Sequence, residues 1–538
     1  MALARTHAMA LVGVQGHPVE IEADIENGLV ALLLVGLPDT ALREARDRIR
    51  SAIVNSGEAW PQRRITVGLS PASLPKRGSG FDLGLAAAIM AAAGVIPADR
   101  LSGMVFLGEL GLDGRVRPVP GVLPAAAAAV AAGFQAMAVP PENVAEATLV
   151  PGLRVLCTPT LGALLAWLRD EQPPSAGRTA GAAGSTAAGK MAAAVMVEPG
   201  AALAALRAAS LAAGPAAGHG RDLADVIGQP VARRAAEICA AGGHHLLLLG
   251  PPGVGKTMLA ERLPTILPPL ELAAALEVSS IHSVAGTLPA GRPLLTEPPF
   301  CAPHHTASKA AIVGGGSGII RPGAASLAHH GCLFLDEAPE FGRDVLDALR
   351  QPLESGEVII ARSGQTATFP ARFTLVLAAN PCPCARASTG GSTCTCTPVV
   401  RRRYLARLSG PLLDRVDVKV ELLPVGRAEL LSDRQLAESS TVVAARVAEA
   451  RQRAARRLRG TRWRLNAEIP GAELRRTFRP APGALAPLER AMDLGEISAR
   501  GVDRIVRLSW TLADLAGVRQ PGTPEIGYAL GLWLGVGQ

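Results

Sequence analysis

The sequence predicts an α/β fold with a parallel sheet at its centre, preceded by a smaller α+β domain and followed by a helical region. Three observations predict it. The apolar run His245–Leu249 leads directly into the letters GPPGVGKT. Two later apolar runs, Gly331–Leu335 and Phe373–Ala379, each end in polar side chains. Short continuous apolar runs are typical of strands buried on both faces of a parallel sheet, whose ends meet at one edge.

The segment after the first run fits the pattern G-x-x-x-x-G-K-[ST] of a phosphate-binding loop. Its glycines allow backbone N–H groups to turn toward the α- and β-phosphates of a nucleotide, and Lys256 can reach the β- and γ-phosphates. The Thr257 hydroxyl can hold Mg²⁺. A helix is expected over Thr257–Leu263, and this strand-loop-helix order argues against a chance glycine turn. We therefore predict ATP and Mg²⁺ binding by Gly250, Pro251, Pro252, Gly253, Val254, Gly255, Lys256, Thr257 and Met258.

Acidic and amide side chains follow the other two apolar runs. Asp336 is predicted to hold the Mg²⁺ shell, and Glu337 to orient and deprotonate the attacking water. Asn380 ends the third run, where its amide can hydrogen-bond the γ-phosphate or the water. The plainer alternative is an acidic turn after a strand. The order of the segments favours ATP hydrolysis, with Lys256, Glu337 and Asn380 as catalytic residues.

Composition shifts divide the chain into four parts. Residues 1–170 alternate short apolar runs with a helical segment, and 171–220 are a linker rich in Ala, Gly, Ser and Pro, with a short helix expected at Ala201–Ala213. Residues 221–424 hold the parallel sheet, and 425–538 are mostly helical. The elements expected in the first part are strands at Ala31–Gly36, Arg64–Leu69, Met104–Leu107 and Ala136–Val139 and a helix at Phe81–Ala93.

Charge and hydropathy restrict the class of protein. The 538 residues include 54 Lys and Arg against 46 Asp and Glu, a net charge of +8, which is compatible with a polyanionic partner but not diagnostic of one. The sequence contains no strongly apolar run of 18 residues and no secretory signal pattern. A cytoplasmic protein without a membrane segment is expected.

The eight cysteines fall into two groups. Cys157, Cys239, Cys301 and Cys332 lie in apolar surroundings and are expected to be reduced core residues. Cys382, Cys384, Cys394 and Cys396 form two C-x-C pairs nine residues apart, which could close a tetrahedral Zn²⁺ site. Free or redox-active thiols remain the alternative, because C-x-x-C is the usual spacing for zinc.

The order of these motifs resembles the AAA+ ATPases of the magnesium-chelatase and MCM type. Longer stretches resemble the ComM/YifB branch of that group, over nearly the whole chain except the linker. The stretches that carry the resemblance are AAGGHHLLLLGPPGVGKTMLAERLP, APHHTASKAAIVGGG, PGAASLAHHGCLFLDEAPEF, DALRQPLESGEV, FTLVLAANPCPC, GPLLDRVD and SARGVDRIVRLSWTLADLAG.

The resemblance implies an AAA+ core with a C-terminal helical lid, assembled into a ring that is usually a hexamer. The arginine of the LLDR motif acts on the nucleotide of a neighbouring subunit in such rings, and this role is carried to Arg415. The arginine of the SAR motif, Arg500, is expected to be a second sensor contributed in cis, and Arg504 is its rival. A surface salt bridge is the plainer interpretation of each arginine.

The first 170 residues resemble the Lon-protease-like domain at the front of ComM-type proteins. Active Lon enzymes use a serine nucleophile with a lysine base. Here the serine position aligns with Asp82 and the lysine position with Leu123 or Ala125, so the catalytic pair is absent. Ser79 and Lys76 are nearby but out of register. The resemblance rests on Leu74–Gly84, Gly108–Val116, Pro118–Val122 and Val139–Val144.

Three functions are compatible with this resemblance. The first is a ComM-like DNA helicase or branch-migration motor that acts in recombination or natural transformation. The second is the ATPase subunit of a magnesium chelatase, against which the front domain and the cysteine cluster argue. The third is a protein-remodelling chaperone or protease, which the missing catalytic pair weakens. The first is preferred, with single-stranded or branched DNA as the expected partner.

Candidate DNA contacts are less specific. An arginine-rich segment could bind phosphate, or could equally form a solvated helix; its members are Arg451, Arg453, Arg456, Arg457, Arg459, Arg462 and Arg464. Two segments are expected to form loops facing a ring pore: Ser308–Pro322, and a hairpin at Glu354–Thr368 with Arg362 near its tip. His304 and His305 could line the nucleotide pocket or the pore, or form a structural pair.

Overall fold

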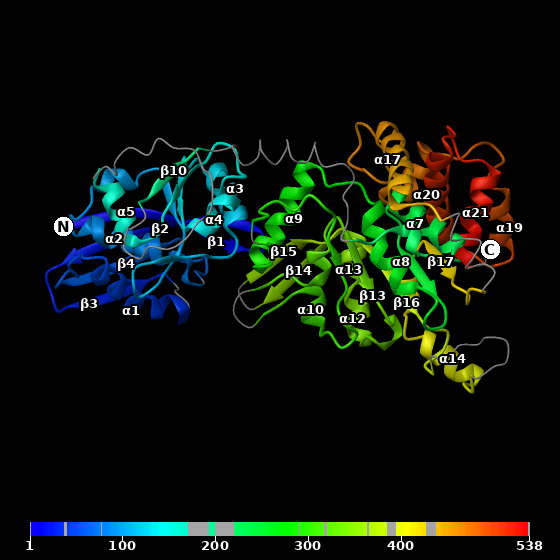
Figure 1. Ribbon diagram of the computed structural model, residues 1–538, viewed down its shortest axis with the longest axis horizontal. Coiled ribbons are helices and arrows are strands. Elements are labelled where there is room, and N and C mark those ends of the chain that lie inside the picture. The colour runs from blue at the N-terminus through cyan, green and yellow to red at the C-terminus, as the bar shows by residue number, and fades with distance from the viewer. Residues whose placement is uncertain are drawn as a thin grey trace.

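The computed structural model is an elongated molecule in which the N- and C-termini lie toward opposite ends (Figure 1). An N-terminal α/β domain, a central α/β domain and a C-terminal group of helices follow one another along its length. The residues that the structure describes are 2–36, 40–76, 78–170, 193–198, 220–289, 291–316, 320–362, 365–384, 394–426 and 437–535.

The N-terminal domain is built on an eight-stranded mixed sheet with the order β10-β9-β8-β5-β1-β2-β4-β3. Its centre is a long antiparallel hairpin, which the sequence analysis did not predict. The strands are β1 (Ala2–Val12), β2 (Gln15–Glu26), β3 (Ala31–Val35), β4 (Arg64–Ser70), β5 (Met104–Phe106), β8 (Ala136–Val139), β9 (Arg154–Cys157) and β10 (Val195–Val197), with a small separate ribbon of β6 (Glu109–Leu110) and β7 (Val116–Arg117).

Five helices accompany this sheet: α1 (Thr40–Asn55), α2 (Asp82–Ala92), α3 (Val122–Ala131), α4 (Pro141–Ala147) and α5 (Leu161–Leu168). Helix α2 is buried along its whole length, which explains its almost uninterrupted apolar sequence. The expected helix at Phe81–Ala93 and the four expected strands are present, with bounds that differ by at most one residue at either end.

Most of the predicted linker at 171–220 lies outside the described residues, as does the expected helix at Ala201–Ala213. Strand β10 lies within that range, however, and pairs antiparallel with β9. The N-terminal sheet therefore continues past residue 170. The short apolar run Val195–Val197 can add an edge strand even though it is embedded in an Ala- and Gly-rich stretch.

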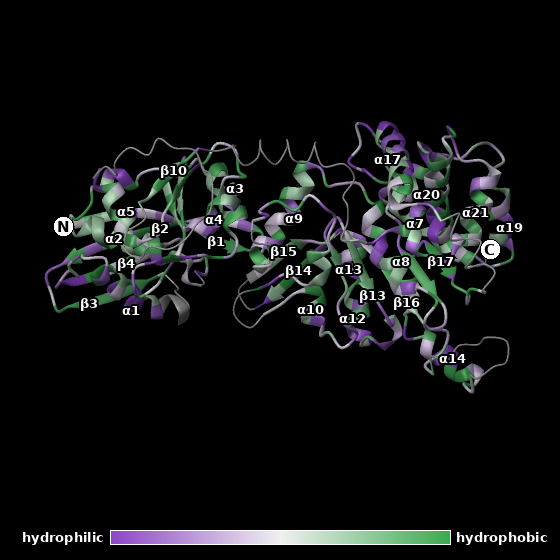
Figure 2. Ribbon diagram, viewed as in Figure 1, coloured by the Kyte–Doolittle hydropathy of each residue, from purple (hydrophilic) through white to green (hydrophobic). Residues whose placement is uncertain are grey.

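The central domain holds a five-stranded parallel sheet with the order β12-β13-β16-β11-β17. Its strands are β11 (Leu246–Leu249), β12 (Phe300–Cys301), β13 (Cys332–Leu335), β16 (Thr374–Ala379) and β17 (Val418–Glu421). Every residue of β13 is buried, and two separate apolar clusters cover the two faces of the sheet. Figure 2 shows these strands mainly in green, in contrast to the purple of α17. This is the predicted α/β fold with a parallel sheet.

The remaining elements of the central domain are helices and one hairpin. The helices are α7 (Pro230–Gly242), α8 (Lys256–Arg262), α9 (Leu272–Ala285), α10 (Lys309–Val313), α11 (Ala324–Leu327), α12 (Arg343–Ala348), α13 (Arg350–Ser355), α14 (Pro398–Leu405) and α15 (Gly410–Leu413). The hairpin pairs β14 (Glu357–Arg362) with β15 (Gln365–Pro370), as predicted, and Arg362 pairs with Gln365 next to the turn.

The C-terminal region is helical, as predicted: α17 (Ser440–Arg457), α18 (Gly471–Arg476), α19 (Ala486–Asp493), α20 (Ala499–Ala516) and α21 (Thr523–Leu534). It shares one apolar cluster with the central sheet, so the two regions form one packed unit. No helix in the described part of the chain has the length and apolar character needed to cross a bilayer.

The N-terminal and central domains also pack together (Figure 1). Helices α3 and α9 share an apolar cluster, and the Gly121 N–H donates to the Ser283 carbonyl at 3.0 Å. The Ser283 hydroxyl donates to the buried Glu146 carboxylate at 2.6 Å, and burial raises the pKa of Glu146. The side of the β14–β15 hairpin that carries Phe369 packs against Val12. The front domain is therefore joined to the predicted pore hairpin by direct contact.

Candidate functional site

The phosphate loop folds between the end of β11 and the start of α8. Gly253 and Gly255 have φ angles of 81° and 95°, in the left-handed region that a glycine adopts without strain. At Gly250 a side chain would place its Cβ 2.6 Å from the Leu422 carbonyl oxygen, so the loop can pass β17 only without one. These glycines shape the loop so that its amides can face a ligand.

Lys256 lies at the centre of this site, with 8% of its surface exposed. Its ammonium donates to the carbonyls of Gly250 and Pro251 at 2.6 and 2.8 Å and to the Asn380 amide oxygen at 3.0 Å. Burial lowers the pKa of Lys256, and the nearby Asp336 and Glu337 carboxylates oppose that shift. The ammonium is thus held at the phosphate loop beside Asn380, Asp336 and Glu337, and these residue types fit a nucleotide with its metal ion.

The acidic pair lies at the same edge of the sheet, after β13. The Thr257 hydroxyl donates to the Asp336 carboxylate at 2.7 Å, which brings together the two residues predicted to hold Mg²⁺. Glu337 follows with φ 50° and ψ 42°, a left-handed conformation that is uncommon for a residue with a side chain. Its side chain is half exposed. The carboxyl edge therefore collects Lys256, Thr257, Asp336, Glu337 and Asn380.

One partner of the acidic pair was missing from the predicted catalytic set. The His305 ring nitrogen Nδ1 lies 3.2 Å from the Glu337 carboxylate. His304 stacks near His305, with ring centroids 4.1 Å apart, and its Nδ1 lies 2.9 Å from the Thr306 hydroxyl. Of the pair, His305 therefore contacts a candidate catalytic residue. The motif PHHT signalled polar side chains here but not which of them would reach the acid.

Arg415 lies at the opposite edge of the sheet. In the register of β11 with β17, Leu246 pairs with Val418 and Leu249 with Glu421. Arg415 precedes the start of β17, whereas the phosphate loop follows the end of β11. Since each strand residue advances about 3.3 Å, β11 separates the two edges by on the order of 10 Å. Arg415 is thus positioned away from the phosphate loop of its own subunit.

Arg415 is 9% exposed and is held by ordinary protein groups. It donates to the Pro411 carbonyl and pairs with the Glu354 carboxylate. Its Nε is buried and has no hydrogen-bond partner among the described residues. Burial, followed by the charges of Arg350, Arg504 and Arg500, lowers its pKa. This guanidinium therefore lies among other arginines, with the Glu354 carboxylate as its ion-pair partner.

Arg504, the rival candidate for the second sensor, has a different role. Its guanidinium donates to the buried Asp417 carboxylate at 2.6 Å and to the Arg415 carbonyl at 2.9 Å. Burial alone would raise the pKa of Asp417, but Arg504 and His244 hold it well below its usual range. Arg504 therefore ties the lid helix α20 to the segment that carries Arg415.

The structure places Arg500 on the same side as Arg415. It is exposed at the start of α20, and its charge is close enough to Arg415 to lower the pKa of that residue. The expected contribution of Arg500 to the nucleotide of its own subunit does not fit this position. Helix α20 begins beside the amino edge of the sheet, which the sequence pattern alone could not indicate.

The four clustered cysteines lie within 4.8 Å of one another through their sulfur atoms. The closest Sγ–Sγ distances are 3.1 Å for Cys382 with Cys384 and 3.4 Å for Cys382 with Cys394. These exceed a disulfide bond of about 2.05 Å and approach the separation of about 3.8 Å expected for two thiolates on one tetrahedral zinc. The residues therefore fit a Cys₄ metal site, and Cys382 lies two residues beyond Asn380.

A second group, Glu277 with His329 and His330, also brings candidate metal ligands together. The His329 Nδ1 accepts the Arg372 N–H at 3.0 Å, so a neutral ring carries its proton on Nε2. That Nε2 lies 3.1 Å from the Glu277 carboxylate and is therefore a donor to it. A nitrogen that carries a proton cannot bind a metal, and this group is better explained as a tie between α9 and β13.

The residues near the Lon-like catalytic positions do not form a pair. Ser79 donates to the Glu109 carboxylate, and the Lys76 ammonium donates to the Pro71 carbonyl. Asp82 is fully buried and binds Arg48 at 3.0 Å. Burial raises the pKa of Asp82 to about 6 although Arg48 opposes the shift. Ser79, Lys76 and Asp82 are therefore each engaged by a different group.

Family models match three parts of the chain. They are described as magnesium chelatase, subunit ChlI, over residues 222–430; subunit ChlI of Mg-chelatase, over 21–143; and magnesium chelatase, subunit ChlI C-terminal, over 437–532. The first contains the phosphate loop, the acidic pair, Asn380 and Arg415. The matched ranges also include most of the front domain and most of the helical region.

Full-length relatives agree with these matches. An uncharacterized protein of Mycobacterium tuberculosis is 51% identical over 531 residues, covering 98% of both chains. The uncharacterized protein YifB of Escherichia coli is 40% identical over 96% of this chain and 94% of its own. The competence protein ComM of Haemophilus influenzae is 40% identical over 99% of this chain and 97% of its own. The chain therefore belongs to the magnesium-chelatase ChlI-like family that includes YifB and ComM.

Proposed function

We propose that this protein is the subunit of an ATP-hydrolysing ring that moves along DNA, acting as a helicase or branch-migration motor in recombination or natural transformation. The observation that carries the proposal is the division of charged groups between the two edges of the sheet. One edge holds the groups that bind and hydrolyse a nucleotide. The other holds Arg415, whose buried Nε has no partner among the described residues.

The carboxyl edge supplies binding and proton transfer. Lys256 and the loop amides hold the phosphates, and Thr257 and Asp336 hold Mg²⁺, which when bound neutralises charge on the phosphate oxygens. Glu337 accepts a proton from the attacking water, and Asn380 orients the water or the γ-phosphate. Asn380 already bonds Lys256 at 3.0 Å, so both residues act on the same phosphate.

The amino edge supplies positive charge to the next subunit. A guanidinium aimed at a γ-phosphate stabilises the charge of the transition state and contributes about 10³- to 10⁵-fold in rate. Arg415 is level with the start of β11, while its own phosphate loop follows the end of that strand. Head-to-tail contact between subunits would bring Arg415, with Arg500 beside it, to a neighbour's nucleotide. Such contacts close into a ring, and we propose a hexamer.

DNA is the proposed track because the chain has a net charge of +8 and a relative at 40% identity is named competence protein ComM. The test is steady-state ATP hydrolysis with and without single-stranded or branched DNA, at low and moderate salt. Stimulation that weakens with salt is expected, because phosphate contacts release counterions. If DNA leaves hydrolysis unchanged, the motor acts on something else.

The descriptions of the matching family models favour a second candidate, the ATPase subunit of a magnesium chelatase. Such a subunit would hydrolyse ATP at the same site and be indifferent to DNA. A protein-remodelling chaperone would also be indifferent to DNA, but its turnover would respond to unfolded protein. The DNA experiment therefore separates the first candidate from the other two.

We further propose that Cys382, Cys384, Cys394 and Cys396 bind one structural Zn²⁺. The close grouping of four sulfurs, all within 4.8 Å of one another, supports this assignment. Metal analysis of the purified protein should give about one zinc per chain, and the double variant Cys382→Ser, Cys394→Ser should lose it. Cys301→Ser, outside the cluster, is the control. Zinc-free wild-type protein would leave free thiols as the explanation.

A further inference from the structure

Three of the seven arginines in the segment that the sequence offered as a DNA contact are engaged inside the protein, and the other four are exposed. Arg451 donates to the Ala240 carbonyl at 2.9 and 2.7 Å, and burial lowers its pKa to about 10. Arg457 binds the Asp514 carboxylate with both terminal nitrogens at 2.6 Å and stacks on Trp510. Arg453 donates to the Asp514 carbonyl at 2.6 Å. These arginines join α17 to α7 and α20, and they are not available for phosphate.

A different set of arginines is open to solvent, on and beside helix α14. Arg402 and Arg403 are exposed, and neither has a carboxylate within ion-pair distance among the residues that the structure describes. Arg407, two residues after the end of α14, pairs with Glu340 at 3.1 Å and is 55% exposed. Arg343 is 82% exposed, with Asp347 at 3.9 Å. We name Arg343, Arg402, Arg403 and Arg407 the α14 arginine face.

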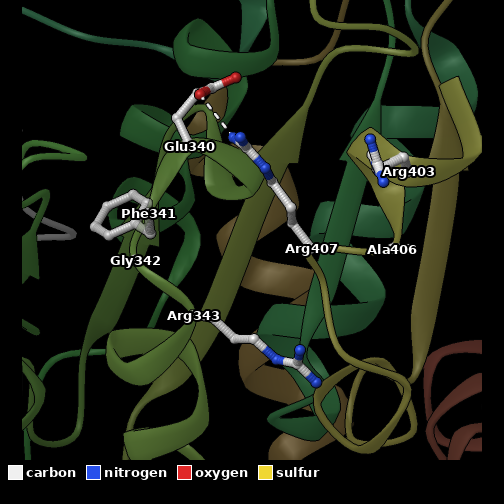
Figure 3. A pocket seen from close by; sticks show the side chains of 7 residues that line it. All are labelled: Glu340, Phe341, Gly342, Arg343, Arg403, Ala406 and Arg407. Carbon is white, nitrogen blue, oxygen red and sulfur yellow. Dashed lines mark hydrogen bonds and ion pairs between the residues drawn. The ribbon is translucent and has the colours of Figure 1, made fainter. Parts of the chain in front are cut away.

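Three members of this face surround one hollow of about 520 Å³. Figure 3 shows Arg407 pointing at Glu340, with Arg403 on one side of it and Arg343 on the other. The hollow is lined by Glu340, Phe341, Gly342, Arg343, Arg403, Ala406 and Arg407. Helix α14 itself protrudes from the central domain (Figure 1). A protruding helix can reach a long ligand that would not fit a narrow cleft.

The chemistry of the face suits a polyanion backbone. Guanidinium groups bind phosphate oxygens through a planar fork of donors. The neighbouring aromatic side chains, Phe341 and Tyr404, are 3% and 5% exposed, so neither offers a surface on which a base could stack. Such a face binds phosphates without reading sequence. We propose that the α14 arginine face is the DNA-backbone contact of this protein; this inference rests on the proposed function.

The face is also connected to the residues proposed for hydrolysis. Arg407 donates to the Pro339 carbonyl at 3.2 Å and pairs with Glu340, in the turn that follows Glu337. The chain runs from Asn380 through the cysteine cluster into α14, and Arg401 contacts the Cys394 sulfur at 3.4 Å. DNA bound at α14 would therefore shift the segments that carry Glu337 and Asn380, which accounts for the proposed stimulation of ATP hydrolysis.

The test compares two double charge reversals in the full-length protein. Arg402→Glu with Arg403→Glu alters the α14 arginine face, and Arg456→Glu with Arg459→Glu alters two exposed arginines of the other segment by the same charge. The affinity for a fluorescent 30-nucleotide oligo(dT) is measured by anisotropy across a salt series with a non-hydrolysable ATP analogue. Equal thermal unfolding midpoints for both variants and the wild type show that they fold.

The α14 variant should bind oligo(dT) at least about tenfold more weakly at low salt, with the slope of log K against log salt reduced by about 1 or more. The control should bind within about twofold of the wild type. Unchanged affinity in the α14 variant, or equal weakening in both, overturns this inference while the proposed function stands. Loss of the ring in the α14 variant alone also overturns it, because the face would then bind an acidic surface of a neighbouring subunit. Wild-type protein that binds no DNA contradicts the proposed function itself.

Discussion

The two edges of the five-stranded sheet differ in how far their polar side chains find hydrogen-bond partners within the chain. At the carboxyl edge, Lys256 is surrounded by three oxygens and Thr257 bonds Asp336, so donors and acceptors of one subunit already fit together. At the amino edge, three other arginines lie close enough to lower the pKa of Arg415, whose Nε lacks a partner among the described residues. The groups at the carboxyl edge already bond one another, whereas the amino edge concentrates positive charge that in the proposed ring would face an anion of a neighbouring subunit.

This difference explains why the carboxyl edge carries a lysine, Lys256, and the amino edge an arginine, Arg415. A lysine within the loop adjusts its position to phosphates that its own loop holds. An arginine at a subunit edge presents a fixed fork of donors to a partner that arrives separately. Arg504 bonds Asp417 and the Arg415 carbonyl, so the lid is tied to the backbone beside Arg415. The lid and the amino edge therefore form one structural unit.

The largest effect is expected for Arg415→Ala, which should lower turnover by roughly 10³-fold or more while ATP still binds. Rings mixed from Arg415→Ala and Glu337→Gln subunits should regain activity, because some interfaces then combine an intact arginine with an intact glutamate. Turnover of co-expressed, doubly tagged rings is the measurement. If the mixed rings show no more turnover than rings of either variant alone, Arg415 of one subunit does not act together with Glu337 of another.

The second-largest effect is expected for Glu337→Gln, which should lower turnover by about 10²- to 10⁴-fold, because the amide cannot accept the proton of the attacking water. Affinity for a fluorescent ATP analogue should remain, since Lys256 and the loop are untouched. Asp344→Asn, an exposed acid on α12, is the matched control and should keep its activity. If the Glu337→Gln protein still hydrolyses ATP, another residue is the base.

The carboxyl edge could be predicted from the sequence and the amino edge could not. Strands β11, β13 and β16 are short apolar runs, and a parallel sheet brings their following residues together, so Lys256, Asp336, Glu337 and Asn380 follow from local pattern. Arg504 and Asp417 are 87 residues apart, and nothing in the spacing indicates their contact. Sequence indicated Arg415 and Arg500 only through resemblance, and it did not indicate that the two residues lie near one another.

The arginine-rich segment is a second case in which the sequence did not indicate contacts between distant residues. Seven arginines in fourteen residues resemble a phosphate-binding surface, but Arg451 bonds the Ala240 carbonyl, 211 positions earlier in the sequence. Amino-acid composition does not indicate which face of a helix packs against the rest of the protein. The hairpin of β1 and β2 was missed although Val19–Glu26 alternates apolar with acidic residues, a pattern typical of a strand buried on one face, and strand β10 was missed because it lies in an Ala- and Gly-rich stretch.

A stability difference between the edges is expected from His245, which is partly buried at the amino edge just before β11. Its Nδ1 accepts the Leu375 N–H at 3.0 Å, and burial lowers its pKa to about 4. The folded pKa lies below the unfolded value of 6.5, so the neutral ring favours folding above pH 6.5, and this contribution is lost as pH falls toward 4. The loss amounts to about 3 kcal/mol.

Chemical denaturation of wild type and His245→Asn between pH 7.5 and 4.5 measures this contribution. Asparagine can accept the same N–H but does not titrate, so the stability of the variant should fall less steeply below pH 6.5. Parallel curves for the two proteins would mean that the folded ring is protonated as readily as the unfolded one.

The smallest effect concerns His305, which lies against Glu337 at the carboxyl edge. A carboxylate engaged by a ring nitrogen at 3.2 Å must be released before it can accept a proton from water, so the contact restrains Glu337 in the resting site. Half-exposed pairs of this kind contribute up to about 1 kcal/mol, and His305→Ala should therefore raise DNA-free ATP turnover by about two- to fivefold. His304→Ala, which alters the neighbouring ring that contacts Thr306, should leave turnover unchanged. If His305→Ala instead lowers turnover as Glu337→Gln does, His305 assists the glutamate. The carboxyl edge would then need a further residue for catalysis, just as the amino edge needs a further subunit in the proposed ring.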